Sequence, residues 1–241
     1  MSDADIAAKY LFIKLYNSTI MLKKSTEKTV IANVIPVLKI FKNSLHKPLR
    51  LSDIEKRIEL SHQTVFRKIK ILEANGILLK VGNYYKPNFE NYLVYKILEL
   101  ISAREREEFF NKYPKLKEPL NRLINFAIKN PEIEFIILFG SYATGKATKT
   151  SDIDLFIVIE DIVKEKIKEK LENLFKQLEG GYFLNKYGFA PIYATPKDVK
   201  EMIDERKKFI QSIIEEGIII YGEDNYYRDI VPLLKDWITW K

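Results

Sequence analysis

Two short apolar segments joined by a polar loop constrain this chain more than any other feature. The first segment, residues 135–139, ends in Gly140-Ser141, and the second, residues 155–159, follows Asp152 and Asp154. Each segment has the length of a buried strand. Because side chains two positions apart on a strand point to the same face, we expect the two carboxylates to project together beside the Gly140-Ser141 turn.

This arrangement suits a metal ion and a phosphate group. Two carboxylates beside a turn of small residues with free backbone N–H groups can hold a magnesium ion and the phosphates that it carries. We therefore predict a magnesium–nucleotide site in which Asp152 and Asp154 bind the metal. Lys146 and Lys149 in the loop offer positive charge to a triphosphate, although solvated loop lysines explain them equally well.

The same residues resemble a known family. Gly-Ser, ten residues and Asp-x-Asp, set between two strands, is similar to the signature of the polymerase-β-like nucleotidyltransferases, and above all to their small, minimal branch. The resemblance covers roughly residues 130–222 and ends in the tail of residues 216–222. Four further residues agree with the branch, namely Ala143, Gly145, Ser151 and Leu155, whereas Tyr142 and Thr144 stand where it often carries arginine.

The resemblance implies a fold, an activity and a set of roles. The fold would be α+β or α/β, with a mixed sheet packed on helices. The activity would be magnesium-dependent transfer of a nucleoside monophosphate from a nucleoside triphosphate to a hydroxyl. Asp152 and Asp154 would be the catalytic, metal-binding carboxylates, and Gly140, Ser141 and Lys146 would bind the nucleotide. Active members use a third carboxylate on a neighbouring strand, but the expected strand here, residues 189–195, contains no Asp or Glu.

The N-terminal third of the chain carries the positive charge. Residues 39–86 contain 11 Lys and Arg against 4 Asp and Glu, a surplus of +7 that equals the net charge of the whole chain. Helical spacing predicts a helix over residues 35–44, and a capping box at Ser52–Glu55 begins a second. Ser61 caps a third, which ends at Asn75-Gly76. Residues 77–81 and 84–86 then read as a hairpin.

Three helices followed by a hairpin resemble a winged helix-turn-helix domain. That resemblance implies that the third helix lies in the DNA major groove and that the hairpin touches the DNA backbone. The candidate DNA-binding residues are His62, Gln63, Thr64, Arg67, Lys68, Lys70, Tyr84, Tyr85 and Lys86. A winged helix used only for dimerisation, or a basic surface that is merely solvated, is the alternative.

These patterns divide the chain into three parts. We predict a winged helix-turn-helix domain with an extra N-terminal helix over residues 1–88, a helical linker over 89–129 and a nucleotidyltransferase-like domain over 130–241. Further helices are expected over residues 7–22, 89–110, 120–128, 161–179, 196–216 and 226–240, and further strands over 189–195 and 218–221. A strand is the alternative for residues 7–22.

Composition narrows the function classes. The chain has no cysteine and only two histidines, which argues against disulfides and a structural zinc site. No apolar run is long enough to span a bilayer and the N-terminus lacks a secretory pattern, so we expect a cytoplasmic protein.

The expected partners are double-stranded DNA, a nucleoside triphosphate, a second copy of the chain in a homodimer, and a toxin-like protein, since minimal-branch members often act as antidotes. The alternative function is a DNA-binding transcriptional regulator or antitoxin-type protein with an inactive or only nucleotide-binding transferase domain.

Overall fold

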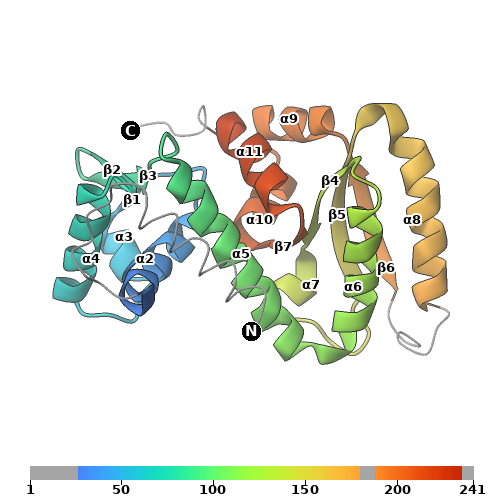
Figure 1. Cartoon of the computed structure of the whole chain (residues 1–241), viewed down its shortest axis with the longest axis horizontal. Coiled ribbons are helices and arrows are strands. Elements are labelled where there is room, and N and C mark those ends of the chain that lie inside the picture. The colour runs from blue at the N-terminus through green and yellow to red at the C-terminus, as the bar shows by residue number, and fades with distance from the viewer. Residues whose placement is uncertain (1–26, 180–187, 235–241) are drawn as a thin grey trace. The chain divides into compact units, whose positions relative to one another are not determined.

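A computed structural model describes residues 27–179 and 188–234 and separates the chain into two compact units (Figure 1). In the described part, the first unit holds residues 27–101 and Leu234, and the second begins at Ser102 and ends at Leu233. The boundary lies inside one continuous helix, α5 (Tyr92–Lys112). The helix predicted over residues 7–22 and the end of that predicted over 226–240 lie outside the described residues.

The first unit has the element order that the sequence predicts, three helices and then a hairpin. Ser61 caps the third helix by accepting the backbone N–H of Thr64, and Gly76, at φ +66°, ends the turn after it. The strands form an antiparallel sheet in the order β1-β3-β2. The elements are α2 (Glu27–Lys42), β1 (Leu49–Arg50), α3 (Leu51–Glu55), α4 (His62–Ala74), β2 (Leu78–Val81) and β3 (Tyr84–Pro87).

The second unit is built on a four-stranded mixed sheet in the order β6-β5-β4-β7. β5 is antiparallel to β4 and parallel to β6, and β4 is antiparallel to β7. After the end of α5, the elements are α6 (Pro114–Ile128), β4 (Ile133–Leu138), α7 (Gly140–Ala143), β5 (Ile153–Ile159), η1 (Asp161–Val163), α8 (Lys164–Glu179), β6 (Phe189–Ala194), α9 (Pro196–Asp204), α10 (Lys208–Glu216), β7 (Ile218–Tyr221) and α11 (Glu223–Leu233).

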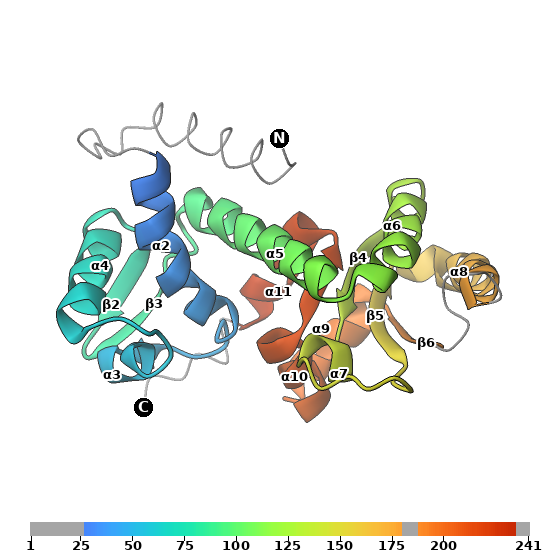
Figure 2. The ribbon, with the colours of Figure 1, turned by 90° about the horizontal axis from the view of Figure 1, so that it is seen from below.

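Helices cover both faces of this sheet. The odd-numbered residues of β5, from Ile153 to Ile159, are fully buried in a core with α6 and α8. The even-numbered residues face the other side, where Phe156 packs on Phe209 of α10. Figure 2 shows α6 and α8 on one side of the sheet and α9 and α10 on the other. Both faces of β5 are therefore apolar and buried, and Asp154 stands at the start of the face that α10 covers.

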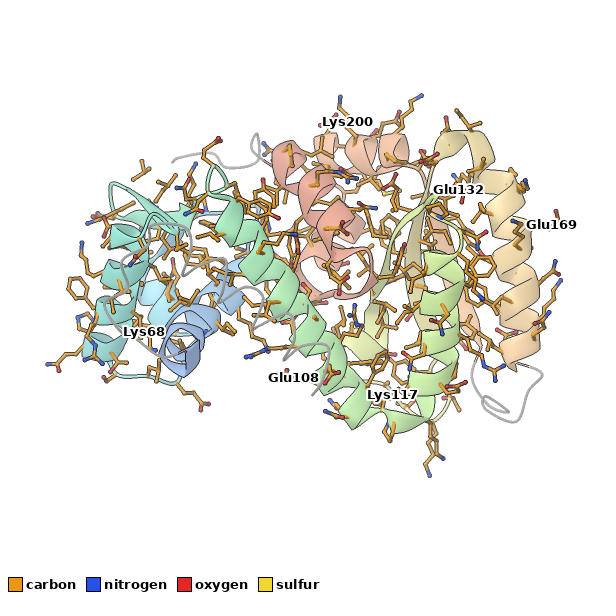
Figure 3. All side chains as sticks on the ribbon, viewed as in Figure 1. Lys68, Glu108, Lys117, Glu132, Glu169 and Lys200 are labelled. Carbon is orange, nitrogen blue, oxygen red and sulfur yellow. The ribbon has the colours of Figure 1, made fainter. Side chains whose placement is uncertain are left out.

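The two ends of the sheet differ in what they carry. β4 ends, and β5 begins, at the end that holds Gly140 and Asp154. At the opposite end Glu132 precedes β4, and its carbonyl accepts the N–H of Glu160. Figure 3 shows Glu132 and Lys200 of α9 toward that opposite end. Among the residues that the structure describes, no helix combines the length and the apolar character needed to cross a membrane.

Three sequence predictions were wrong. The capping box expected at Ser52–Glu55 is not formed there, because α3 begins at Leu51 and the Asp53 carboxylate accepts the N–H of Arg50. The single helix expected over residues 196–216 is two helices, because Arg206 has φ +52° and ends α9, with its N–H bonded to the carbonyl of Ile203. No glycine signals this break. The helix expected over residues 120–128 begins earlier, at Pro114, so Pro114 and Pro119 both lie in α6. Pro114 occupies the first turn, where it needs no hydrogen-bonded N–H.

Candidate nucleotide and metal site

The structure brings Gly140, Ser141, Asp152 and Asp154 together at one end of the sheet. Asp152 directly precedes β5 and is exposed, whereas Asp154 is its second residue and is partly buried. The backbone N–H of Phe139 donates to the carbonyl of Asp154 at 3.0 Å, which places the end of β4 against the start of β5. The chain then turns into α7 at Gly140. The predicted juxtaposition is therefore present.

Gly140 touches the Asp154 carboxylate so closely that no side chain fits there. A Cβ atom on Gly140 would lie 2.1 Å from Asp154 Oδ2 and 2.9 Å from its Cγ. The backbone of Gly140 also has φ +70°, which L-residues with a Cβ rarely adopt. The backbone N–H of Ser141 donates to the same carboxylate. The Gly-Ser pair thus fixes the position of Asp154 as well as forming the turn.

The carboxylates repel each other at this site. Burial raises the pKa of the Asp154 carboxyl, the negative charge of Asp152 raises it further, and the Ser141 N–H opposes the rise. The two charges sit on one face of β5, so a cation between them would relieve the repulsion. Magnesium is commonly bound through one or two carboxylates together with substrate phosphates, so this pair fits the ion.

A third carboxylate is not supplied by the neighbouring strand. In the register of β5 and β6, Ala190 lies opposite Asp154. No group of three Asp, Glu, His or Cys side chains within the described residues is arranged to hold a metal ion. Asp198, which follows β6, caps α9 by accepting the N–H of Thr195 and also bonds to Lys164. Hydrogen bonds from Thr195, chiefly its backbone N–H, and from Lys164 lower the pKa of Asp198.

Sequence reasoning missed two residues beside Asp152. A Cβ atom on Gly188 would lie 3.1 Å from Asp152 Oδ1 and 4.0 Å from Glu179 Oε1. Glu179, at the end of α8, accepts the N–H of Phe189 at 2.7 Å and so holds the start of β6. A glycine directly before a strand was the only available signal, and the glycine matters here because β6 starts close to Asp152.

The loop lysines remain open to solvent. Lys146 and Lys149 are both exposed, and the Lys146 N–H donates to the carbonyl of Ser141. A Cβ atom on Gly145 would lie 2.7 Å from Lys112 Nζ, so a lysine from α5 also lies against this loop. Lys112 was not among the predicted residues. It lies more than thirty positions before the loop, so spacing could not reveal it.

The predicted DNA-binding residues divide into two groups. Lys68 on α4 and Tyr85 on β3 are only 8% and 4% exposed, so both of these side chains are buried in the fold. Tyr85 points inward because it alternates along β3 with Tyr84 and Lys86. The others are exposed or partly exposed, namely His62, Gln63, Thr64, Arg67, Lys70, Tyr84 and Lys86.

Comparisons with known proteins agree with this geometry. Residues 121–226 match the family described as Polymerase beta, Nucleotidyltransferase. The mixed sheet packed on helices in this segment is consistent with a polymerase-β-like nucleotidyltransferase fold. A protein of Methanocaldococcus jannaschii named "Putative protein adenylyltransferase MJ1305" is 32% identical over 102 residues, which are 42% of this chain and 66% of that protein. The chain thus spans slightly less than two thirds of that relative. A comparison with solved structures found no match.

The matched segment contains the whole site. It begins in α6 and ends in α11, so it includes Gly140, Ser141, Asp152 and Asp154 but not α4 or the hairpin. The family match therefore bears on the second unit alone.

Replacing Gly140 by alanine should damage both fold and site. The added methyl meets Asp154, and the positive φ adds roughly 1 to 2 kcal/mol of strain. Gly145→Ala is the matched control, because Gly145 has φ +74° but its nearest neighbour is the movable end of Lys112. Thermal unfolding should show a larger loss for Gly140→Ala. Equal losses would mean that the contact with Asp154 contributes nothing.

Asp154→Asn should stabilise the protein at neutral pH. An acid whose pKa is raised on folding contributes stability below its unfolded pKa, and this contribution is lost as pH rises through its folded pKa. The ionised carboxylate therefore weakens the fold at pH 7, and the amide removes that effect. The melting temperature of the variant should exceed the parent's at pH 7, and the difference should shrink at about pH 3, below the ordinary aspartate pKa.

Magnesium supplies the second half of this test. Added Mg²⁺ should raise the melting temperature of the parent and leave Asp154→Asn nearly unchanged. Asp161→Asn, at the opposite end of β5, should respond as the parent does. An equal response of all three proteins would remove Asp154 from the metal site.

Proposed function

We propose that this chain is a magnesium-dependent nucleotidyltransferase that moves a nucleoside monophosphate from a nucleoside triphosphate to a hydroxyl acceptor. The observation that carries the proposal is the contact of the Gly140-Ser141 turn with Asp154, the second residue of the strand that Asp152 directly precedes. The family match over residues 121–226 supports it. The name of the M. jannaschii relative favours ATP as donor and a protein as acceptor.

The reaction follows from the chemistry of the groups. An acceptor oxygen forms a bond to the α-phosphorus, the bond from that phosphorus to the bridging oxygen breaks, and pyrophosphate leaves with its electron pair. The acceptor hydroxyl releases its proton. Magnesium, when bound, would neutralise phosphate charge and make the acceptor hydroxyl more acidic.

The residues of this chain have distinct tasks in that reaction. Asp152 and Asp154 would hold the cation, and the Ser141 N–H orients Asp154. Gly140 lets the backbone approach the Asp154 carboxylate closely, so the phosphates can lie beside the backbone and the carboxylate at once. With Ala190 opposite Asp154, β6 provides no base for the acceptor. We therefore expect slow transfer, in which positioning and metal charge supply most of the rate.

Label transfer tests this function. The protein is incubated with magnesium and ATP labelled at the α-phosphate, alone and with a cell extract. Label should appear on a protein acceptor and fall by about 100-fold or more in the Asp152→Ala/Asp154→Ala double variant. The matched control is Glu160→Ala/Asp161→Ala, two exposed acids at the other end of β5, which should transfer like the parent. A folded parent that labels nothing would contradict the proposal.

A second function, DNA binding, is favoured by the first unit. Its three helices and hairpin have the order of a winged helix, and α4 exposes His62, Gln63, Arg67 and Lys70 on its outer side. The surplus of +7 over residues 39–86 lies in this unit. We propose that α4 enters the major groove of duplex DNA and that Tyr84 and Lys86 contact its backbone. We also propose that the chain binds a two-fold DNA site as a homodimer. The acceptor of the transferred nucleotide would then be a toxin-like protein.

Arg67 should read bases in this complex. After selection of a preferred duplex from a random pool, Arg67→Ala should weaken binding to that duplex by about 10-fold or more and binding to random DNA much less. Arg122→Ala, which removes one exposed arginine from α6 of the second unit, is the control and should bind as the parent does. Affinity that does not fall with rising salt would contradict DNA binding by this unit.

A further inference from the structure

The break between α9 and α10 places positive charge near the nucleotide site. Residues 206–208 are Arg-Lys-Lys, and all three are exposed. Lys207 is paired with Glu205 at 2.8 Å. Within the described part of the chain, the side chains of Arg206 and Lys208 form no ion pair or hydrogen bond. Two uncommitted cations therefore lie at this junction.

Aromatic contacts connect the junction to the site. Phe209, the residue after Lys208, packs its ring against Phe139 at 5.5 Å and against Phe156 at 5.7 Å between centroids. Phe139 directly precedes Gly140, and Phe156 lies two residues after Asp154 on the same face of β5. The first turn of α10 thus lies on the face of the sheet that carries Asp154, next to the Gly140 turn.

The fold does not favour this arrangement on its own account. Among the non-glycine residues that the structure describes, Arg206 alone has a positive φ, a conformation that glycine adopts without strain. Cations at the start of a helix are also electrostatically unfavourable, because that end carries the positive end of the helix dipole. Neither Arg206 nor Lys208 therefore has an evident structural task.

We propose that Arg206 and Lys208 are nucleotide-binding residues that contact the β- and γ-phosphates of the triphosphate held at Asp152 and Asp154. This inference rests on the proposed transferase function. Two cations offset the negative phosphate charge that a single magnesium ion does not neutralise. A guanidinium also donates two parallel N–H groups to phosphate oxygens. They also stabilise the pyrophosphate as it leaves.

The positive φ of Arg206 makes a clean variant possible. Arg206→Gly removes the guanidinium and relieves backbone strain, so its melting temperature should equal or exceed that of the parent. Affinity for Mg-ATP should nevertheless fall by about 10-fold, the scale of one charged hydrogen bond. Affinity for AMP, which lacks the β- and γ-phosphates, should stay unchanged. Lys208→Ala should behave in the same way, and both affinities are measured by calorimetry.

Lys197→Ala is the matched control. It removes one exposed cation from the start of α9, at the opposite end of the sheet, and should bind Mg-ATP as the parent does. A lower melting temperature for Arg206→Gly would overturn the inference by giving Arg206 a structural role. Unchanged Mg-ATP affinity in both variants would overturn it too, even with weaker transfer, because the cations would then serve the acceptor. A parent that fails to bind Mg-ATP would overturn the proposed function as well.

Discussion

The site depends on the close approach of Gly140 to the carboxylate of Asp154. This approach requires β4 and β5 to run side by side in opposite directions, with the N–H of Phe139 bonded to the carbonyl of Asp154. It also requires the backbone of residue 140 to turn at φ +70°. A residue with a Cβ would meet the carboxylate, so the glycine and the aspartate determine each other. The Asp154 carboxylate and the turn take their positions from this contact.

β5 is buried on both faces, and its charged residue Asp154 lies near its start. Along β5, the odd-numbered residues are sealed in the core against α6 and α8, and they anchor the strand. The even-numbered residues begin with Asp154 at the solvent end and continue to Phe156, which packs on Phe209. A strand buried on both faces can hold a partly buried charge at its end, although that burial raises the pKa of the charged group. The same aromatic packing brings the cations at residues 206–208 to this side of the sheet.

Prediction succeeded where spacing alone sets the geometry. Asp152 and Asp154 share a face because a strand repeats every two residues, and Ser61 and Gly76 bound α4 because capping is local. Prediction failed where long-range packing determines which side chains are buried and where a helix ends. The winged-helix pattern predicts Tyr85 and Lys68 as DNA-binding residues, but the fold buries both side chains. Arg206 ends a helix without the glycine that normally signals such a break.

The sequence by itself determined the two strands, the paired carboxylates, the Gly-Ser turn between them and the basic three-helix unit, since each depends on residues near one another in the chain. Only the tertiary structure decided which distant residues join them. Strand register sets Ala190 opposite Asp154, the start of β6 places Gly188 beside Asp152, and helix packing places Phe209 against Phe139. Those neighbours come from separate elements, and packing and hydrogen bonding across the sheet bring them together, which no local pattern encodes.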